Sequence, residues 1–388
     1  MQLAITTAFG ARPDEARRHN RTAVLRRLHV FGPATRAALA TELGLNRSTI
    51  KAVVDGLVED GVVEESVPRQ RSGAGRPSLL VMPRSQAAAV LAVDIRTDRV
   101  AIAVVGIGGE MLGRNSWKLH DRTRSPDEVI THVIESTRIL LEELKLEMVA
   151  AGVSVPGVVR RHDGLVHEAP NLHWTDVPLG QRLSGALGFP VHVGNDAELG
   201  ALAEHVRGVA RGASDAVYVS ADIGVGGGVI SSGAAMRGTA GYVGEVGHMV
   251  INPHGRPCYC GSSGCWETEV GEQAIARALG MSEQSPRGAI VAELRTADAV
   301  ERLASVTEWL VLGLVNVVNV LGPELVVLGD LFTALPNDVV THIGEEVRRR
   351  SLVSRAAGGT RVVASTFGAD VMLIGAAELA FEPVLGLA

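Results

Sequence analysis

Apolar residues near the N-terminal end of the chain recur at helical spacing and predict a group of short helices. The first predicted helix turns Val24, Leu28 and Phe31 to one face and ends at Gly32-Pro33. A second helix is expected to begin after Thr35, because a threonine hydroxyl caps a helix N-terminus well. The pattern is that of a small bundle of packed helices.

A third helix is predicted to begin at Asn46 or Arg47, after a tight turn. Apolar residues form one stripe along it over residues 50–58. Polar and basic side chains gather at its N-terminal end: Asn46, Arg47, Ser48, Thr49 and Lys51. In a helix-turn-helix this end of the recognition helix contacts base edges and phosphates in the major groove. These five side chains are therefore the predicted DNA contacts, although the bases that they recognise cannot be derived.

Two short strands are predicted next, at residues 62–65 and 78–81, around a tip rich in arginine and glycine. This pattern is typical of a wing. Within the tip, Gly75-Arg76-Pro77 is narrow and extended, so Arg76 is suited to enter a minor groove. A solvated linker loop is an equally good interpretation of the tip.

Charge divides the chain more sharply than its net charge of -6 indicates. Residues 1–84 hold 13 lysines and arginines against 8 acidic residues, whereas the rest of the chain holds 24 against 35. A basic unit before an acidic body favours a polyanionic partner for the N-terminal unit alone. We therefore predict that residues 1–84 form a winged helix-turn-helix domain, with its wing and linker, that binds double-stranded DNA. A helical protein-interaction module is the alternative.

After Pro83 the pattern changes to that of a glycine-rich α/β body. Apolar strands are predicted at residues 90–95, 100–105, 150–155, 191–193, 216–219 and 325–328, with helical stretches between most of them. The segment 309–321 is apolar but shorter than a membrane span, and Asn316 and Asn319 interrupt it, so we expect a buried helix. Residues 1–18 lack the pattern of a secretion signal. The expected location is therefore the cytoplasm, without membrane association.

The cysteines point to a metal site. All 3 cysteines of the chain are Cys258, Cys260 and Cys265, and an odd number in one short segment makes a poor disulfide framework. Three thiolates and the imidazole of His248 would complete the tetrahedral ligand set that Zn²⁺ prefers, with no position left for a reactive water. We therefore predict a structural zinc ion, with buried free cysteines as the alternative.

These residues resemble the ROK family, whose name stands for repressors, open reading frames and kinases. The marks of that family are a Glu-x-Gly-His motif, here Glu245 to His248, followed by this cysteine pattern. The resemblance extends from about residue 20 to 388, and the regulators of the family carry a winged helix in front, as here.

The resemblance implies an α/β body at residues 85–388 with the actin-like, ribonuclease-H-like fold of a sugar kinase, in which two lobes close on a cleft. One lobe is expected at about 85–200 plus the C-terminal helix, the other at about 201–370, and the zinc loop at 248–267.

The resemblance also implies a sugar site at the base of the cleft. The matching positions are Gly157, Asn171, Asn195, Asp196, Glu245, His248 and Glu267. Carboxylates and amides offer the acceptors and donors that a polyhydroxylated ring needs, and the zinc would fix His248 and the loop that presents Glu267. Asp196 matches the base that deprotonates the sugar hydroxyl in the kinases. A plain helix cap is the alternative for Asn195-Asp196 taken alone, and the surrounding match favours the sugar site.

Two loops that bind ATP phosphates in the kinases of this family are altered. The first carries Asp-x-Gly-x-Thr in those kinases, whereas here Arg96 replaces the glycine and Asp98 adds a negative charge. In the second loop Asp222-Ile223 replaces Gly-Thr. We therefore predict no phosphotransfer. As an alternative use, Arg96 could bind an anion such as the phosphate of a sugar phosphate.

Together these features predict a sugar-responsive transcription regulator, most simply a repressor, that acts as a homodimer or homotetramer on an approximately palindromic operator. A bound sugar or sugar derivative would favour a more closed body and change the spacing of paired winged helices. An ATP-dependent sugar kinase with a DNA-binding appendage and a zinc-responsive repressor are the alternatives.

Overall fold

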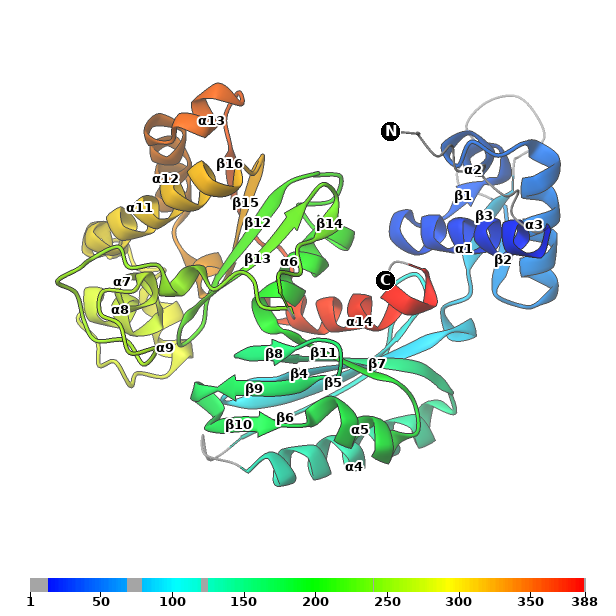
Figure 1. Ribbon diagram of the computed structural model, residues 1–388, viewed down its shortest axis with the longest axis horizontal. Helices are drawn as coiled ribbons and strands as arrows, with labels where there is room; N and C mark the ends of the chain where they lie inside the picture. The colour runs from blue at the N-terminus through cyan, green and yellow to red at the C-terminus, as the bar shows by residue number, and fades with distance from the viewer. Residues whose placement is uncertain (1–12, 68–78, 120–124, 240, 387–388) are drawn as a thin grey trace, which may run out of the picture.

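The computed structural model describes residues 13–67, 79–119, 125–239 and 241–386. A small helical unit at the N-terminal end lies beside a larger body, in which each lobe is built on a five-stranded sheet (Figure 1). The predicted architecture, a helical N-terminal unit followed by a two-lobed α/β body, is confirmed.

The N-terminal unit consists of three helices and a small antiparallel sheet. The helices are α1 (Pro13–Phe31), α2 (Arg36–Glu42) and α3 (Arg47–Glu59). The sheet has the order β1 (Ala34–Thr35), β3 (Leu80–Pro83), β2 (Val63–Ser66). As predicted, the Thr35 hydroxyl accepts the backbone N–H of Ala38 at 3.1 Å and caps α2. The side chain of Asn46 caps α3 by accepting the N–H of Thr49 at 2.8 Å.

The expected apolar face of α1 is wrong at one position. Val24 and Leu28 are fully buried among the helices, but Phe31 is 54% exposed. Phe31 is the last residue of α1, and its ring lies 5.2 Å from the guanidinium carbon of Arg27 and 4.6 Å from that of Arg211. Cations from α1 and from the body flank this aromatic ring, which packs outside the core of the helices.

The first lobe is built on a sheet with alternate residues facing two layers. Its strand order is β11 (Val191–Asn195), β7 (Met148–Val155), β4 (Ala89–Ile95), β5 (Arg99–Gly106), β6 (Met111–Lys118). Leu91 and Val93 pack toward α4 (Pro126–Leu144) and α5 (Leu179–Leu187). Val90 and Ala92 pack toward α14 (Val371–Val384) on the other face. Both faces of the sheet are therefore buried, which explains the continuous apolar runs in the sequence.

The second lobe repeats this strand order. Its sheet runs β14 (Ala234–Ala235), β13 (Val225–Ser231), β12 (Ala216–Ala221), β15 (Leu325–Asp330), β16 (Arg361–Ala364). The outer layer contains α11 (Ala304–Leu321) and α12 (Asn337–Arg350). The strands predicted for the body are present as β4, β5, β7, β11, β12 and β15.

The two lobes contain further helices and strands outside the two five-stranded sheets. They are β8 (Val158–Arg160), β9 (Leu165–Ala169), β10 (Trp174–Val177), α7 (Trp266–Val270), α8 (Glu272–Ala278), α9 (Arg287–Glu293), α10 (Ala299–Arg302) and α13 (Leu352–Ala356). By length and composition α11 could cross a membrane, but half of it is buried inside the second lobe. It contains the segment for which a buried helix was predicted.

Helices α6 (Asp196–Arg207) and α14 lie between the two sheets (Figure 1). Glycines allow their backbones to come unusually close. A Cβ at Gly375 of α14 would lie 2.0 Å from the carbonyl oxygen of Leu199, and one at Gly228 of β13 would lie 2.3 Å from that of Ala197. Helix α6 is therefore in direct backbone contact with α14 and with the second sheet.

Candidate functional site

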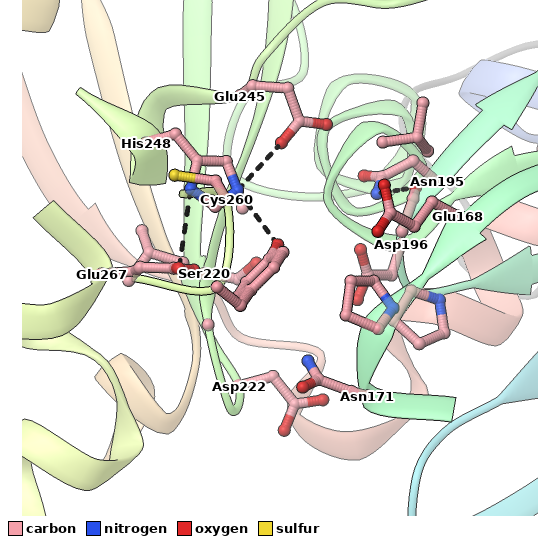
Figure 2. A pocket seen from close by; sticks show the side chains of 18 of the residues that line it. Glu168, Asn171, Asn195, Asp196, Ser220, Asp222, Glu245, His248, Cys260 and Glu267 are labelled. Carbon is pink, nitrogen blue, oxygen red and sulfur yellow. Dashed lines mark hydrogen bonds and ion pairs between the residues drawn. The ribbon is translucent and has the colours of Figure 1, made fainter. Parts of the chain in front are cut away.

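A cavity of about 370 Å³ opens between the lobes, at the ends of β7, β11 and β12 and beside the loop that follows β12 at Asp222. Its described lining includes every residue expected in the sugar site: Gly157, Asn171, Asn195, Asp196, Glu245, His248 and Glu267. These side chains come from segments far apart in the sequence. In Figure 2, Glu245, His248 and Glu267 lie on one side, Glu168, Asn195 and Asp196 lie on the other, and Asn171 and Asp222 lie near the lower edge.

Gly157 follows β7 at a position that only glycine fits. Its φ is +111°, and a Cβ there would lie 2.2 Å from the carbonyl oxygen of Glu168. The carbonyl oxygen of Gly157 accepts a hydrogen bond from Asn195 Nδ2 at 2.9 Å. This bond joins the turn after β7 to the end of β11.

Asn195 is both a helix cap and a lining residue of the cavity. Its Oδ1 accepts the N–H groups of Ala197 at 2.8 Å and Glu198 at 3.2 Å, at the start of α6. The neighbouring Asp196 also faces the cavity. Burial, with a smaller contribution from the Asp222 carboxylate, raises the pKa of Asp196 to about 7. Asn195 and Asp196 can therefore stand at the start of α6, where Asn195 caps the helix, and line the cavity at the same time.

On the opposite side, Glu245 and Glu267 flank His248, which ends a short 3₁₀ turn at Val246–His248. Glu245 Oε2 lies 3.8 Å from His248 Nε2, and Glu267 Oε1 lies 3.5 Å from His248 Nδ1 (Figure 2). The buried indole of Trp266 anchors the Glu267 segment, because its Nε1 donates to the carbonyl oxygen of Trp309 at 3.0 Å.

The expected metal ligands form one cluster. One ligand atom from each of His248, Cys258, Cys260 and Cys265 lies within 4.8 Å of all the others. Cys258 Sγ is 3.6 Å from His248 Nδ1, and Cys260 Sγ is 3.6 Å from Cys265 Sγ. Zinc–sulfur bonds of about 2.3 Å in a tetrahedron place two sulfurs about 3.8 Å apart, so this donor set fits a zinc ion. His248 presents Nδ1 to the sulfurs and Nε2 to the cavity.

Sequence reasoning missed three polar residues that line the cavity, Glu168, Ser220 and Tyr259. Glu168, on β9, faces the side that carries Asn195. Tyr259, between two of the cysteines, lies over His248, and their Oη and Nε2 atoms are 3.0 Å apart. The place of Tyr259 between two of the cysteines is a signal that could have identified it, whereas β9 shows no alternation of apolar and polar residues that would mark Glu168.

An ion-pair network lies beside the cavity, where the loops that carry Arg96 and Asp222 meet. Arg96 contacts Asp94 at 3.0 Å and Asp330 at 2.8 Å, so it joins the two lobes. Arg287 contacts Asp330 at 2.7 Å and Asp222 at 2.6 Å. Asp330 holds both guanidinium groups from a backbone with a φ of +53°, which is rare for a residue other than glycine.

The predicted DNA contacts lie apart from the cavity, in the N-terminal unit. Asn46, Arg47 and Ser48 are exposed at the start of α3, and Thr49 is half-buried. Lys51 is exposed as well and pairs with Asp55 of the next helical turn at 2.6 Å. Arg76 lies outside the described residues.

Known proteins match either nearly the whole chain or a shorter part of it. The family model for the ROK family matches residues 90–382. The xylose repressor of Bacillus spizizenii is 27% identical over 374 residues, which cover 95% of this chain and 96% of the repressor. A glucokinase of Halalkalibacterium halodurans is 28% identical over 306 residues, but these cover only 73% of this chain and 92% of the glucokinase.

Solved structures support the same fold. The crystal structure of a ROK family transcriptional regulator, described as a homologue of the Escherichia coli Mlc protein, matches 95% of this chain and 98% of that chain with a TM-score of 0.74. At 24% identity this likeness shows the fold alone. The match of the family model over most of the body, with the Glu245 to His248 motif and the cysteine loop in place, shows that the chain belongs to the ROK family.

Proposed function

We propose that this protein is a sugar-responsive transcriptional repressor that acts in the cytoplasm. The observation that carries the proposal is the cavity between the lobes, where carboxylates and amides converge from β9, β11, the start of α6 and the segments around His248 and Glu267. Such groups recognise a polyhydroxylated ligand. The xylose repressor aligns with this chain over nearly the full length of both proteins, which supports the role of a transcriptional repressor.

In this proposal the sugar lies between the two sides of the cavity. Asp196, Glu245 and Glu267 accept hydrogen bonds from sugar hydroxyls, and Asn171 and Asn195 can both donate and accept. Gly157 lets the turn after β7 pack against β9 and would offer its backbone to the ring, because a Cβ there would meet the carbonyl oxygen of Glu168. His248 contributes Nε2, the ring nitrogen that faces the cavity.

A zinc ion held by His248, Cys258, Cys260 and Cys265 would have a structural role. With all four positions taken by protein ligands, it would supply rigidity to the loop and would fix the imidazole ring of His248. Glu267 follows Cys265 by two residues. The ligand set would therefore hold the Glu245 and Glu267 side of the sugar site in place.

We further propose that the effector is an unphosphorylated sugar and that no phosphoryl transfer occurs. Arg96 and Arg287 already contact the carboxylates of Asp94, Asp222 and Asp330, so their guanidinium groups are occupied. Acidic groups outnumber basic ones here, since Arg287 also pairs with Glu272 at 2.7 Å. A phosphate would meet repulsion from these carboxylates, which argues against both ATP and a sugar phosphate as ligands.

For DNA binding, we propose that residues 1–84 act as a winged helix-turn-helix in front of a sugar-binding body at 85–388. The N-terminal end of α3 would enter the major groove, with Arg47 and Lys51 toward base edges and Asn46, Ser48 and Thr49 toward bases or phosphates. Arg76 would contact the minor groove from the wing. Paired copies of the chain, as a homodimer or homotetramer, would require an approximately palindromic operator.

A thermal-shift assay followed by DNA-binding measurements would test the proposal. The probes are D-xylose, D-glucose, D-glucosamine and D-glucose 6-phosphate, together with a duplex that the full-length protein enriches from a random-sequence library. We expect one unphosphorylated sugar to raise the Tm and to change the operator Kd. Failure of every sugar to do so would overturn the sensor function. ADP formation from ATP and a sugar would overturn the non-enzymatic part.

Two variants separate the two functions. Glu245→Gln removes a charged acceptor from the cavity and should weaken sugar binding about 10-fold or more while operator binding persists. Arg47→Ala should weaken operator binding about 10-fold or more while the sugar-induced change in Tm persists. Loss of both functions in either variant would contradict this assignment, unless its Tm without ligand had fallen as well.

A further inference from the structure

A buried polar cluster outside the described lining of the cavity joins the N-terminal unit to the body. It consists of His29 on α1, Arg207 at the end of α6 and Glu378 on α14. His29 and Glu378 are 1% and 2% exposed. Ionisable side chains are costly to bury without hydrogen-bond partners. The partners of these three side chains therefore show which elements the cluster joins.

Every polar atom of the His29 ring has a partner in the body. The backbone N–H of Gly108, between β5 and β6, donates to Nδ1 at 2.9 Å. On the other side of the ring, Nε2 lies 3.0 Å from Glu378 Oε2 and 2.7 Å from Arg207 Nη2. The ring also packs on Phe381, with 4.6 Å between ring centroids. The last turn of α1 is therefore held by the body of the protein.

Arg207 completes the cluster from the C-terminal end of α6. Its Nε donates to Glu378 Oε1 at 2.5 Å, and its Nη1 donates to the carbonyl oxygens of His29 at 3.2 Å and Gly108 at 3.1 Å. A Cβ at Gly109 would lie 2.4 Å from the guanidinium carbon, so that glycine makes room for it. Burial opposes ionisation of Glu378, but hydrogen bonds from His29 and Arg207, together with the Arg207 charge, lower its pKa.

The same helix α6 begins at the cavity. Asp196 is its first residue and Arg207 its last, and the 12 residues between these limits span about 18 Å. The backbone contacts at Gly228 and Gly375 leave α6 little room to bend. A displacement of its N-terminal end is therefore transmitted along the axis, because packed helices move as rigid units.

On the other side of the cluster, α1 belongs to two cores at once. Val24 and Leu28 pack with α2 and α3, whereas Leu25 and Val30 pack against the core between the first sheet and α14. The helix that contacts α6 is thus the helix on which α3 is packed. A shift or rotation of α1 changes the direction in which the N-terminal end of α3 points.

We propose that His29, Arg207 and Glu378 are positioning residues that couple occupancy of the cavity to the orientation of the DNA-reading helix, with α6 as the connecting element. This inference rests on the proposed function, because it names the route by which the sugar alters DNA binding. It assigns the two ends of α6 to two tasks: Asp196 contacts the ligand and Arg207 contacts α1.

Glu378→Gln in the full-length protein tests this coupling. The substitution keeps the shape of the side chain and removes the charge that His29 and Arg207 share. Three quantities are measured: the Kd for the best sugar of the panel above, the operator Kd without sugar, and the operator Kd at saturating sugar. In the wild type we expect sugar to change the operator Kd about tenfold. In the variant both binding events should persist, and the sugar-induced change should fall to nearly none.

Glu382→Gln is the matched control. Glu382 lies one turn further along α14, is also buried, and pairs with Arg161 at 2.7 Å and Arg237 at 3.3 Å instead of with the cluster. This variant should keep the full response to sugar.

The outcomes separate the two levels of the argument. A wild type that shows no sugar response overturns the proposed function. A wild type that responds, with Glu378→Gln responding equally or with Glu382→Gln equally impaired, overturns the coupling role of the cluster. If Glu378→Gln gives no cooperative thermal transition, Arg207→Lys takes its place and is judged by the same ratio of operator Kd values, because it retains a charge at the less buried member of the cluster.

Discussion

Two properties of Asp196 would affect the binding of a sugar. It lines the cavity, and burial together with the Asp222 carboxylate raises its pKa to about 7. A sugar hydroxyl donates best to the ionised carboxylate, so the ligand competes with a proton for the same oxygen atoms. Below the pKa, part of the binding free energy is spent on removing that proton.

We therefore predict that sugar affinity increases as the pH rises through about 7, with a limiting slope of about tenfold per pH unit below the pKa. Calorimetric titrations across this range would measure the slope. In Asp196→Asn the remaining affinity should change much less with pH. Burial raises the pKa of Glu198 to about 7 as well, but Glu198 is not among the described residues of the cavity wall, so Glu198→Gln should keep the slope. An unchanged slope in Asp196→Asn would contradict the prediction.

The sequence predicts which residues form the site better than it predicts which side chains contact one another. The residues expected in the sugar site do line one cavity, because the family motifs mark the ends of strands that converge there. The environment of Arg96 could not be predicted in the same way. Its partner Asp330 is 234 positions away, and only the approach of the two lobes brings them together. For the same reason Glu378 gave no signal as a partner of His29.

Among the secondary-structure elements, α11 supports the metal loop through one glycine. A Cβ at Gly313 would lie 2.1 Å from Cε2 of Trp266, the buried residue that precedes Glu267. We predict that Gly313→Ala lowers the free energy of unfolding by about 1–3 kcal/mol, because the core has no room for the methyl group. It should also weaken sugar binding by moving Glu267.

Chemical denaturation and sugar titration of this variant would provide the measurement. Gly344→Ala in α12 is the control, because its Cβ would meet Val362 at an ordinary 3.6 Å. Equal stability of the two variants would show that Trp266 is not held in the way described.

Removing the proposed zinc ion would affect the loop at residues 248–267, which also carries Trp266 and Glu267. Without an ion, nothing links the sulfurs of Cys258, Cys260 and Cys265 to one another, and His248 loses the contact that fixes its ring. We predict that a chelator lowers the Tm and weakens sugar binding, and that added Zn²⁺ restores both. Elemental analysis of the purified protein should find zinc, which Cys260→Ser should reduce. His254→Ala, an exposed position of the same loop outside the cluster, should bind zinc normally. Chelation without any effect would contradict the structural role.

For the whole molecule, sequence patterns predicted the order of the parts but not how they pack together. Strand patterns predicted an α/β body, the family resemblance implied its two lobes, and both sheets have the same strand order. Helix α6 crosses the expected boundary near residue 200 and extends from the cavity to α1. Such packing depends on contacts of high sequence separation, for example the 349 positions between His29 and Glu378, which local patterns do not contain.

The shared position of α1 also has a thermodynamic consequence. Since one helix completes the core of the N-terminal unit and covers part of the body, neither part can melt without exposing apolar surface of the other. Scanning calorimetry of the intact protein should therefore give a single endotherm that includes the DNA-reading unit, and two resolved peaks would show that the units unfold independently. A small molecule bound in the cavity of the body would then protect the helices of the N-terminal unit against heat and proteases, without touching them.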